Sequence, residues 1–189
     1  MREITDLKEI QQMAFHIFAE FETFCREYNI QYFMAFGTLI GTVRHQGFIP
    51  WDDDIDVWVK REEYDKLSAD GADKLPGASF KNKIYGKLAI PFRRINQNKW
   101  TRKYEKVAKR SDCASSDYLL VPYRQSKGRA LMMPAKWVEK SIRMKYENME
   151  ASVPVGYDNV LRFIYGDYMQ LPPEKDRKPI HCMKLYVED

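Results

Sequence analysis

The chain has 189 residues, of which 44% are hydrophobic and 31% are charged, and its formal net charge is +4. This size predicts a single domain over residues 1–189, and the composition is that of an ordinary globular protein, which excludes a disordered or fibrous chain. Because no apolar run approaches the roughly 20 residues of a membrane span and the first ten residues lack a signal-peptide core, we expect a cytoplasmic protein.

The first predicted element is a helix that begins after Thr5 or Asp6. Apolar residues then recur at intervals of three and four, which is the spacing of a helix with one buried face. The same spacing is compatible with a coiled coil, but the aromatic residues in it favour a helix packed on a sheet. Asn29 is expected to end this helix, and residues 30–36 then enter the sheet.

The most informative pattern of the chain covers residues 33–59, FMAFGTLIGTVRHQGFIPWDDDIDVWV. It predicts a buried strand, a Gly-Thr turn that opens a short helix, a Pro-Trp corner, and a second, neighbouring strand that carries acidic residues. Since side chains alternate between the two faces of a strand, Asp52, Asp54 and Asp56 are expected on one face. The apolar residues between and after them are expected on the other face.

This pattern has the chemistry of a phosphate and metal site. Carboxylates held close together repel each other, and a hard divalent cation with oxygen ligands relieves that repulsion, so Mg²⁺ is the expected ion. Gly37 permits close backbone approach, and a helix that begins at Gly37-Thr38 offers N–H groups to phosphate. Arg44 lies about two turns, or ~10 Å, further along the same face. Metal-dependent phosphoryl or nucleotidyl transfer is therefore favoured over the alternative, an acidic surface turn.

Residues 37–56, GTLIGTVRHQGFIPWDDDID, resemble the signature of the LicD family. Members of this family are phosphocholine transferases of bacterial surface glycans, and the fukutin-type ribitol-phosphate transferases are related to them. The resemblance implies an α+β, nucleotidyltransferase-like fold with a small mixed β-sheet flanked by helices. It implies that Mg²⁺ is held by Asp54 and Asp56, which are also the expected catalytic residues. The residues of this segment that are expected to bind nucleotide or phosphate are Gly37, Thr38, Arg44 and His45.

The middle of the chain is strongly basic, with eleven Lys or Arg and one Glu in residues 81–110. Such a stretch is compatible with nucleic-acid binding, with attraction of an anionic nucleotide or glycan, and with a solvated basic face. Composition does not choose among these. Residues 61–69 have helical composition, and residues 79–85 and 88–95 are expected to form short strands or a hairpin.

The family's third metal-binding acid lies in a strand with the pattern Gly-x-x-Ile-Asp-Ile-Phe-Pro, which this chain lacks. Members of the family are also longer, so the chain looks shortened in the middle, at about residues 96–125. Asp117 precedes an apolar run that ends in Pro122, and it is the candidate for the missing catalytic acid. The alternative is a loop or capping aspartate.

Towards the end of the chain, Pro134 is expected to begin a helix over residues 134–146. Residues 153–181 resemble the family's C-terminal signature, in which a helix ends at Gly166 before a Pro-Pro pair. Arg177 and His181 match an Arg and a His of that signature. They are candidates for the nucleotide pocket, with packing roles as the alternative.

The sequence thus favours a Mg²⁺-dependent transferase that moves phosphocholine from CDP-choline onto a cell-surface glycan, lipopolysaccharide or teichoic acid precursor. The expected partners are a nucleotide-activated donor and a glycan or glycolipid acceptor. A catalytically weakened homologue that binds nucleotide and acts as a partner protein is the first alternative, because the third acidic motif is absent. A nucleotidyltransferase that binds nucleic acid is a third and less favoured reading.

Overall fold

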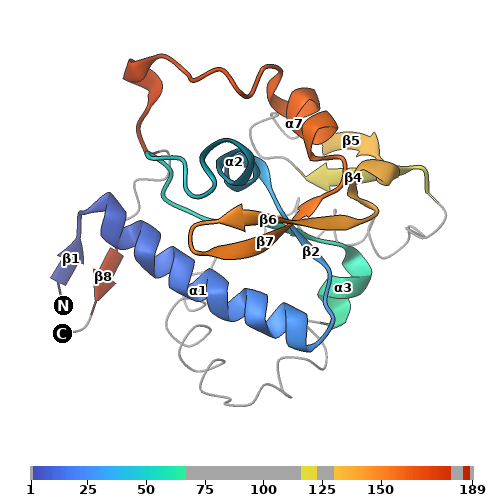
Figure 1. Ribbon diagram of the computed structural model, residues 1–189, viewed down its shortest axis with the longest axis horizontal. Helices are drawn as coiled ribbons and strands as arrows, with labels where there is room; N and C mark the ends of the chain where they lie inside the picture. The colour runs from blue at the N-terminus through green and yellow to red at the C-terminus, as the bar shows by residue number, and fades with distance from the viewer. Residues whose placement is uncertain (1, 67–115, 123–129, 180–184, 188–189) are drawn as a thin grey trace. The chain divides into compact units, whose positions relative to one another are not determined.

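The computed structural model describes residues 2–66, 116–122, 130–179 and 185–187 (Figure 1). The chain divides into two compact units, one comprising Met1–Val59 with Ala135–Asp189 and the other comprising Lys60–Pro134. Helices and short strands occur in both units, which confirms the predicted α+β class. The expected strands within residues 79–95 and the shortened middle fall largely outside the described residues.

The first unit contains most of the described elements. In chain order these are β1 (Arg2–Ile4), α1 (Leu7–Glu27), β2 (Tyr32–Met34), α2 (Phe36–Ile40), the π-helix η1 (Gly41–His45), β3 (Val57–Val59), the 3-10 helix η6 (Ala135–Val138), β6 (Ser141–Tyr146), β7 (Met149–Pro154), α7 (Tyr157–Tyr165), the 3-10 helix η7 (Glu174–Asp176) and β8 (Leu185–Val187). The described elements of the second unit are α3 (Arg61–Lys66), β4 (Tyr118–Pro122) and β5 (Ala130–Pro134). None of the helices described in either unit combines the length and apolar character needed to cross a membrane.

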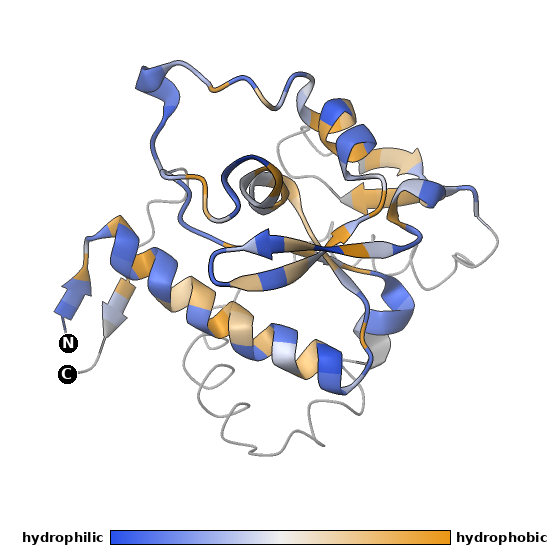
Figure 2. Cartoon of the chain, viewed as in Figure 1, coloured by the Kyte–Doolittle hydropathy of each residue, from blue (hydrophilic) through white to orange (hydrophobic). Residues whose placement is uncertain are grey.

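Helix α1 begins and ends where the sequence predicts. The Asp6 side chain caps it by accepting a hydrogen bond from the Lys8 N–H at 3.0 Å, which satisfies one of the first-turn donors. Hydrophobic and hydrophilic residues alternate along the helix (Figure 2). Its Phe18 ring is buried and makes edge-to-face contacts, at 5.9 Å between ring centroids, with Tyr32 of β2 and Tyr146 of β6. The interpretation of α1 as a helix packed on a core, instead of a coiled coil, is therefore confirmed.

A buried polar network also holds α1 against the strands. Glu22 is only 3% exposed, and its carboxylate accepts hydrogen bonds from the Tyr32 hydroxyl and, at 2.6 Å, from Arg143 of β6. The Tyr32 hydroxyl in turn accepts a hydrogen bond from the N–H of Ser152 in β7 at 3.2 Å. A buried carboxylate is stable only with such partners, so this network fixes one arrangement of α1, β2 and the β6–β7 hairpin.

Strands β2 and β3 pair antiparallel, with Phe33 opposite Trp58, and α2 and η1 lie between them in the chain. This confirms the two neighbouring strands and the intervening helix predicted from residues 33–59. The strands are shorter than predicted, and the helix begins at Phe36 instead of Gly37. Phe36 has a φ of 44°, an uncommon value for a residue with a side chain, so the transition from strand to helix is abrupt.

The predicted helix over residues 134–146 is wrong. The chain forms η6 and then β6, which pairs with β7 through the two-residue turn Glu147-Asn148. In SIRMKY, apolar and basic residues alternate with a period of two, and this is the pattern of a strand. The tolerance of helices for a first-turn proline is weaker evidence than that alternation. Strand β7 lies beside β2 in the core, where Ala151 and Val153 are fully buried.

The predicted mixed sheet is not seen in the described residues, where the strands form four two-stranded antiparallel pairs, β1–β8, β2–β3, β4–β5 and β6–β7. Helix α7 ends at Gly166 as predicted, and that glycine has a φ of 70°. Val160 and Leu161 of α7 are buried, whereas Tyr165 is 37% exposed.

Candidate functional site

A turn and an irregular segment, residues 46–56, connect η1 to β3 and carry the acidic residues. Asp52 closes the turn by donating its N–H to the Ile49 carbonyl at 2.9 Å, with Pro50 at the second position, where its fixed φ suits a β-turn. The Gln11 side chain of α1 binds the same turn, because its Nε2 donates to the carbonyls of Asp52 at 2.8 Å and Ile49 at 3.3 Å. No pattern in the sequence predicts this contact between α1 and the turn.

The β6–β7 hairpin holds the beginning of this segment. Glu147 donates its N–H to the Gln46 carbonyl at 2.8 Å, and its carboxylate accepts the N–H of Phe48 at 2.9 Å. Gly41 of η1 packs so closely on the same segment that an added Cβ would lie 2.5 Å from the carbonyl oxygen of Gly47. Glycine is therefore required at position 41 for the approach of η1 to the loop.

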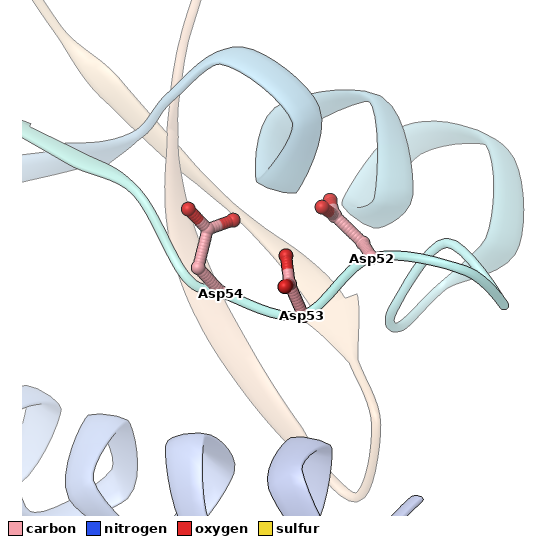
Figure 3. A group of neighbouring side chains, drawn as sticks. All are labelled: Asp52, Asp53 and Asp54. Carbon is pink, nitrogen blue, oxygen red and sulfur yellow. The ribbon is translucent and has the colours of Figure 1, made fainter. Parts of the chain in front are cut away.

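Three carboxylates gather at the end of the turn. Oxygen atoms of Asp52, Asp53 and Asp54 all lie within 4.8 Å of one another (Figure 3). The expected alternation, which excluded Asp53, is wrong because residues 52–56 are irregular and β3 begins only at Val57. We call Asp52, Asp53 and Asp54 the acidic cluster.

Asp56 lies outside the acidic cluster but close to it. Its N–H donates to the Thr38 hydroxyl at 2.8 Å, and its carbonyl accepts the Ala35 N–H at 2.9 Å. Thr38 is only 3% exposed. The hydroxyl of Thr38 thus fixes the backbone just before β3, a role that the sequence does not predict.

The electrostatics of the acidic cluster suit a cation. Burial, and then the charges of Asp54, Asp53 and Asp56, raise the pKa of Asp52 to about 7. One Asp52 carboxylate oxygen lies 2.8 Å from the position that a Cβ on Gly37 would occupy, so the glycine lets this carboxylate reach the first turn of α2. Clustered carboxylate oxygens are the ligands that Mg²⁺ and other hard cations prefer, and the residues present therefore fit such an ion.

Gly37 and Thr38 belong to the first turn of α2. The first hydrogen bond within the helix runs from the Leu39 N–H to the Ala35 carbonyl, at 2.9 Å, and no side chain caps the helix. First-turn N–H groups of a helix have no partner within it. The assignment of the Gly37 and Thr38 amides to phosphate is compatible with this geometry and stays a prediction.

Arg44 and His45 are tied into the first unit. Arg44 Nη1 donates to the carbonyls of Tyr168 and Gln170, and Arg44 Nε lies 3.4 Å from His45 Nδ1. Burial lowers the pKa of both side chains, and the charge of Arg44 lowers that of His45 further, so His45 is neutral at pH 7. Arg44 therefore anchors the segment after α7, in addition to any role toward phosphate.

Arg177 lies beside the residue that precedes the acidic cluster. Its guanidinium carbon is 5.6 Å from the centre of the Trp51 ring, and its Nε donates to the Pro172 carbonyl at 2.9 Å. The Trp51 ring also contacts the His45 ring, at 6.4 Å between centroids. The structure thus brings Arg44, His45 and Arg177 to one region around Trp51, a residue for which the sequence pattern predicts no role in binding.

The two remaining candidates are His181 and Asp117. His181 lies outside the described residues. Asp117 belongs to the second unit, where it is exposed and directly precedes β4.

Comparison with known proteins identifies the family. The sequence model described as LicD/FKTN/FKRP, nucleotidyltransferase domain, matches residues 29–155. The chain belongs to this family. The match contains the acidic cluster, α2, η1 and the β6–β7 hairpin, and it confirms the resemblance seen in residues 37–56.

Individual relatives add detail. The chain is 27% identical to the lipopolysaccharide cholinephosphotransferase LicD of Haemophilus influenzae over 266 aligned positions, which take in 99% of this chain and all of the relative. It is 54% identical over 35 residues to uncharacterized proteins of Rickettsia prowazekii and Rickettsia typhi. Those short matches cover 18% of this chain and 13% and 11% of the two relatives.

Proposed function

We propose that this LicD family protein is a Mg²⁺-dependent transferase that moves phosphocholine from CDP-choline onto a lipopolysaccharide or other cell-surface glycan precursor. The observation that carries this proposal is the acidic cluster, held against the first turn of α2 in a member of a transferase family. The choice of phosphocholine is supported by the likeness to a protein named as a lipopolysaccharide cholinephosphotransferase.

In this proposal each part of the site has a separate task. The acidic cluster and Asp56 supply oxygen ligands, and a bound Mg²⁺ would neutralise charge on the donor's diphosphate. The amides of Gly37 and Thr38 bind a phosphate oxygen. Arg44 holds the segment after α7 against η1 and adds positive potential near the phosphates.

The test is the Mg²⁺ dependence of donor binding and transfer. Purified protein is screened against CDP-choline, CDP-ribitol and CDP-glycerol, with thermal stabilisation and transfer to lipopolysaccharide as readouts. We expect CDP-choline to stabilise the protein only with Mg²⁺, and Asp54→Asn to abolish both stabilisation and transfer. Asp176→Asn, an exposed aspartate of η7, is the control and should change neither.

Two further variants distinguish the ligand sets. Asp56→Asn should abolish the Mg²⁺ effect if Asp54 and Asp56 hold the ion, as the family signature implies. Asp53→Asn should do so if the acidic cluster holds it. Mg²⁺-dependent binding of CDP-choline without transfer to any acceptor would instead identify a nucleotide-binding homologue that has lost its activity.

A further inference from the structure

A cleft of about 430 Å³ lies in the first unit beside the α2–η1 helix. Ile40 and Arg44 line it from that helix, and Trp51 lines it from the turn before the acidic cluster. Tyr165 and Leu171, which are 37% and 45% exposed, line it from the end of α7 and the segment that follows. Its volume falls within the range of small-molecule sites, about 300–1,000 Å³.

The cleft and the acidic cluster lie along the same helix. An added Cβ on Gly37 would lie 2.8 Å from an Asp52 carboxylate oxygen, and Ile40 and Arg44 follow Gly37 by three and seven residues. Ile40 lies about one α-helical turn, or ~5 Å, beyond Gly37, and Arg44 lies in the π-helix that continues α2. In addition, Trp51 is bonded directly to Asp52. A single ligand whose anionic group is held at the acidic cluster through a bound cation can therefore place an adjoining group in the cleft.

The charges around the cleft indicate which chemical group of the ligand the cleft binds. Arg44 lines the cleft, and the Arg177 guanidinium lies 5.6 Å from the centre of the Trp51 ring, whereas Asp167 is the one acidic residue among its lining residues. A positively charged trimethylammonium group would be repelled by the two guanidinium groups. A neutral planar ring that carries hydrogen-bond acceptors is favoured, because it can stack on Trp51 or Tyr165 and accept from a guanidinium.

We propose that this cleft binds the nucleobase of the donor, while the donor's phosphates lie at the acidic cluster. The inference rests on the proposed function, since it assumes a nucleotide donor. It assigns the base to residues that lie largely outside the family signature in residues 37–56. The choline end of the donor then lies away from the cleft.

The first test removes one aromatic wall. Binding of CMP in the presence of Mg²⁺ is measured by titration calorimetry on the full chain. Tyr165→Ala should weaken CMP binding by roughly 5- to 150-fold, the range expected for the loss of one base–aromatic contact. Phe163→Ala is the matched control, because Phe163 lies on the same helix, is 48% exposed and packs on Trp137 instead of lining the cleft. It should leave CMP binding within about twofold.

The second test separates a nucleobase from a choline group by charge. Leu171→Asp should weaken CMP binding by about fivefold or more, because it adds a carboxylate near an anionic ligand. Met169→Asp, at a residue that is 52% exposed and does not line the cleft, controls for the added charge. Stronger binding of phosphocholine or choline by Leu171→Asp would overturn the proposal and assign the cleft to the trimethylammonium group.

The outcomes also separate this inference from the proposed function. If the wild type transfers phosphocholine but Tyr165→Ala and Leu171→Asp bind CMP normally, the inference fails and the function stands. If no transfer occurs but both variants lose CMP binding, the function fails and the cleft assignment stands. Absence of CMP binding by a wild type that transfers phosphocholine would likewise overturn the assignment.

Discussion

Asp52 lies where burial and three neighbouring carboxylates all favour its protonated form. The pKa of its side chain is raised to about 7, against about 3.9 in an unfolded chain. At a pH between these two pKa values, the Asp52 carboxyl holds a proton in the folded protein that it has released in the unfolded chain. The free energy of unfolding therefore falls as the pH rises through this interval. A bound cation would relieve the repulsion between Asp52 and the neighbouring carboxylates.

We therefore expect the metal-free protein to be more stable near pH 5 than near pH 8, and Asp52→Asn to reduce this difference. The contribution of Asp52 is at most about 4 kcal/mol, since one pKa unit corresponds to about 1.4 kcal/mol, and solvent screening makes it smaller. Urea unfolding of both proteins with a chelator, at about pH 5 and pH 8, measures it. An identical pH dependence in the variant would show that Asp52 ionises normally.

Thr38 supports the site through its hydroxyl. Because this hydroxyl accepts the N–H of Asp56 at 2.8 Å in a buried position, Thr38→Val should cost about 1–3 kcal/mol of unfolding free energy. Thr38→Ser keeps the acceptor and should recover most of the Mg²⁺-dependent donor binding that the valine variant loses. Equal donor binding by the two variants would mean that the hydroxyl has no part in positioning Asp56.

At the scale of elements, α1 contributes to the site although it lies before the matched residues 29–155. Gln11 binds the carbonyls of Ile49 and Asp52, so Gln11→Ala should cost about 0.5–1.5 kcal/mol of stability per lost hydrogen bond and weaken Mg²⁺ binding several-fold. The control is Gln12→Ala, because Gln12 is the exposed neighbour on the same helix. Calorimetric titration of Mg²⁺ into both variants is the measurement, and equal affinities would contradict a positioning role for Gln11.

The elements that the sequence predicts well are those with a local signal. The cap at Asp6 and the regular apolar spacing locate α1, and the contrast between an apolar run and the Gly-Thr pair locates β2 and the start of α2 within one or two residues. The predicted helix over residues 134–146 is wrong because a first-turn proline is a weaker signal than the alternation in β6. The alternation leaves Asp53 out because it assumes a strand over the acidic segment, whereas pairing begins only at Val57.

No pattern of neighbouring residues in the sequence predicts the contacts that complete the site. Arg44 binds carbonyls 124 and 126 residues away, and Glu147 binds an N–H 99 residues away. Spacing within one segment cannot reveal such pairs, because they arise only when the C-terminal segments fold onto η1. The same holds for Trp51, whose significance depends on His45 and Arg177 lying against its ring.

At the scale of the whole molecule, the first unit carries the acidic cluster and the cleft, and the second unit carries Asp117. Family membership supports a transferase, and transfer to an acceptor hydroxyl generally uses a base that takes its proton. Asp117 remains the candidate for that base. Asp117 is exposed directly before β4, so its carboxylate is accessible to solvent.

If Asp117 is the base, Asp117→Asn should lower the rate of phosphocholine transfer by about 10²–10⁴-fold, the usual contribution of general-base catalysis. Affinity for CDP-choline should stay within a few-fold, because the donor-binding residues of the first unit are unchanged. Single-turnover transfer and calorimetric donor binding are measured on the same preparations, with Asp176→Asn as the exposed control. An unchanged transfer rate would exclude Asp117 as the base, whereas an equal loss of donor affinity and rate would assign it to donor binding instead of proton transfer.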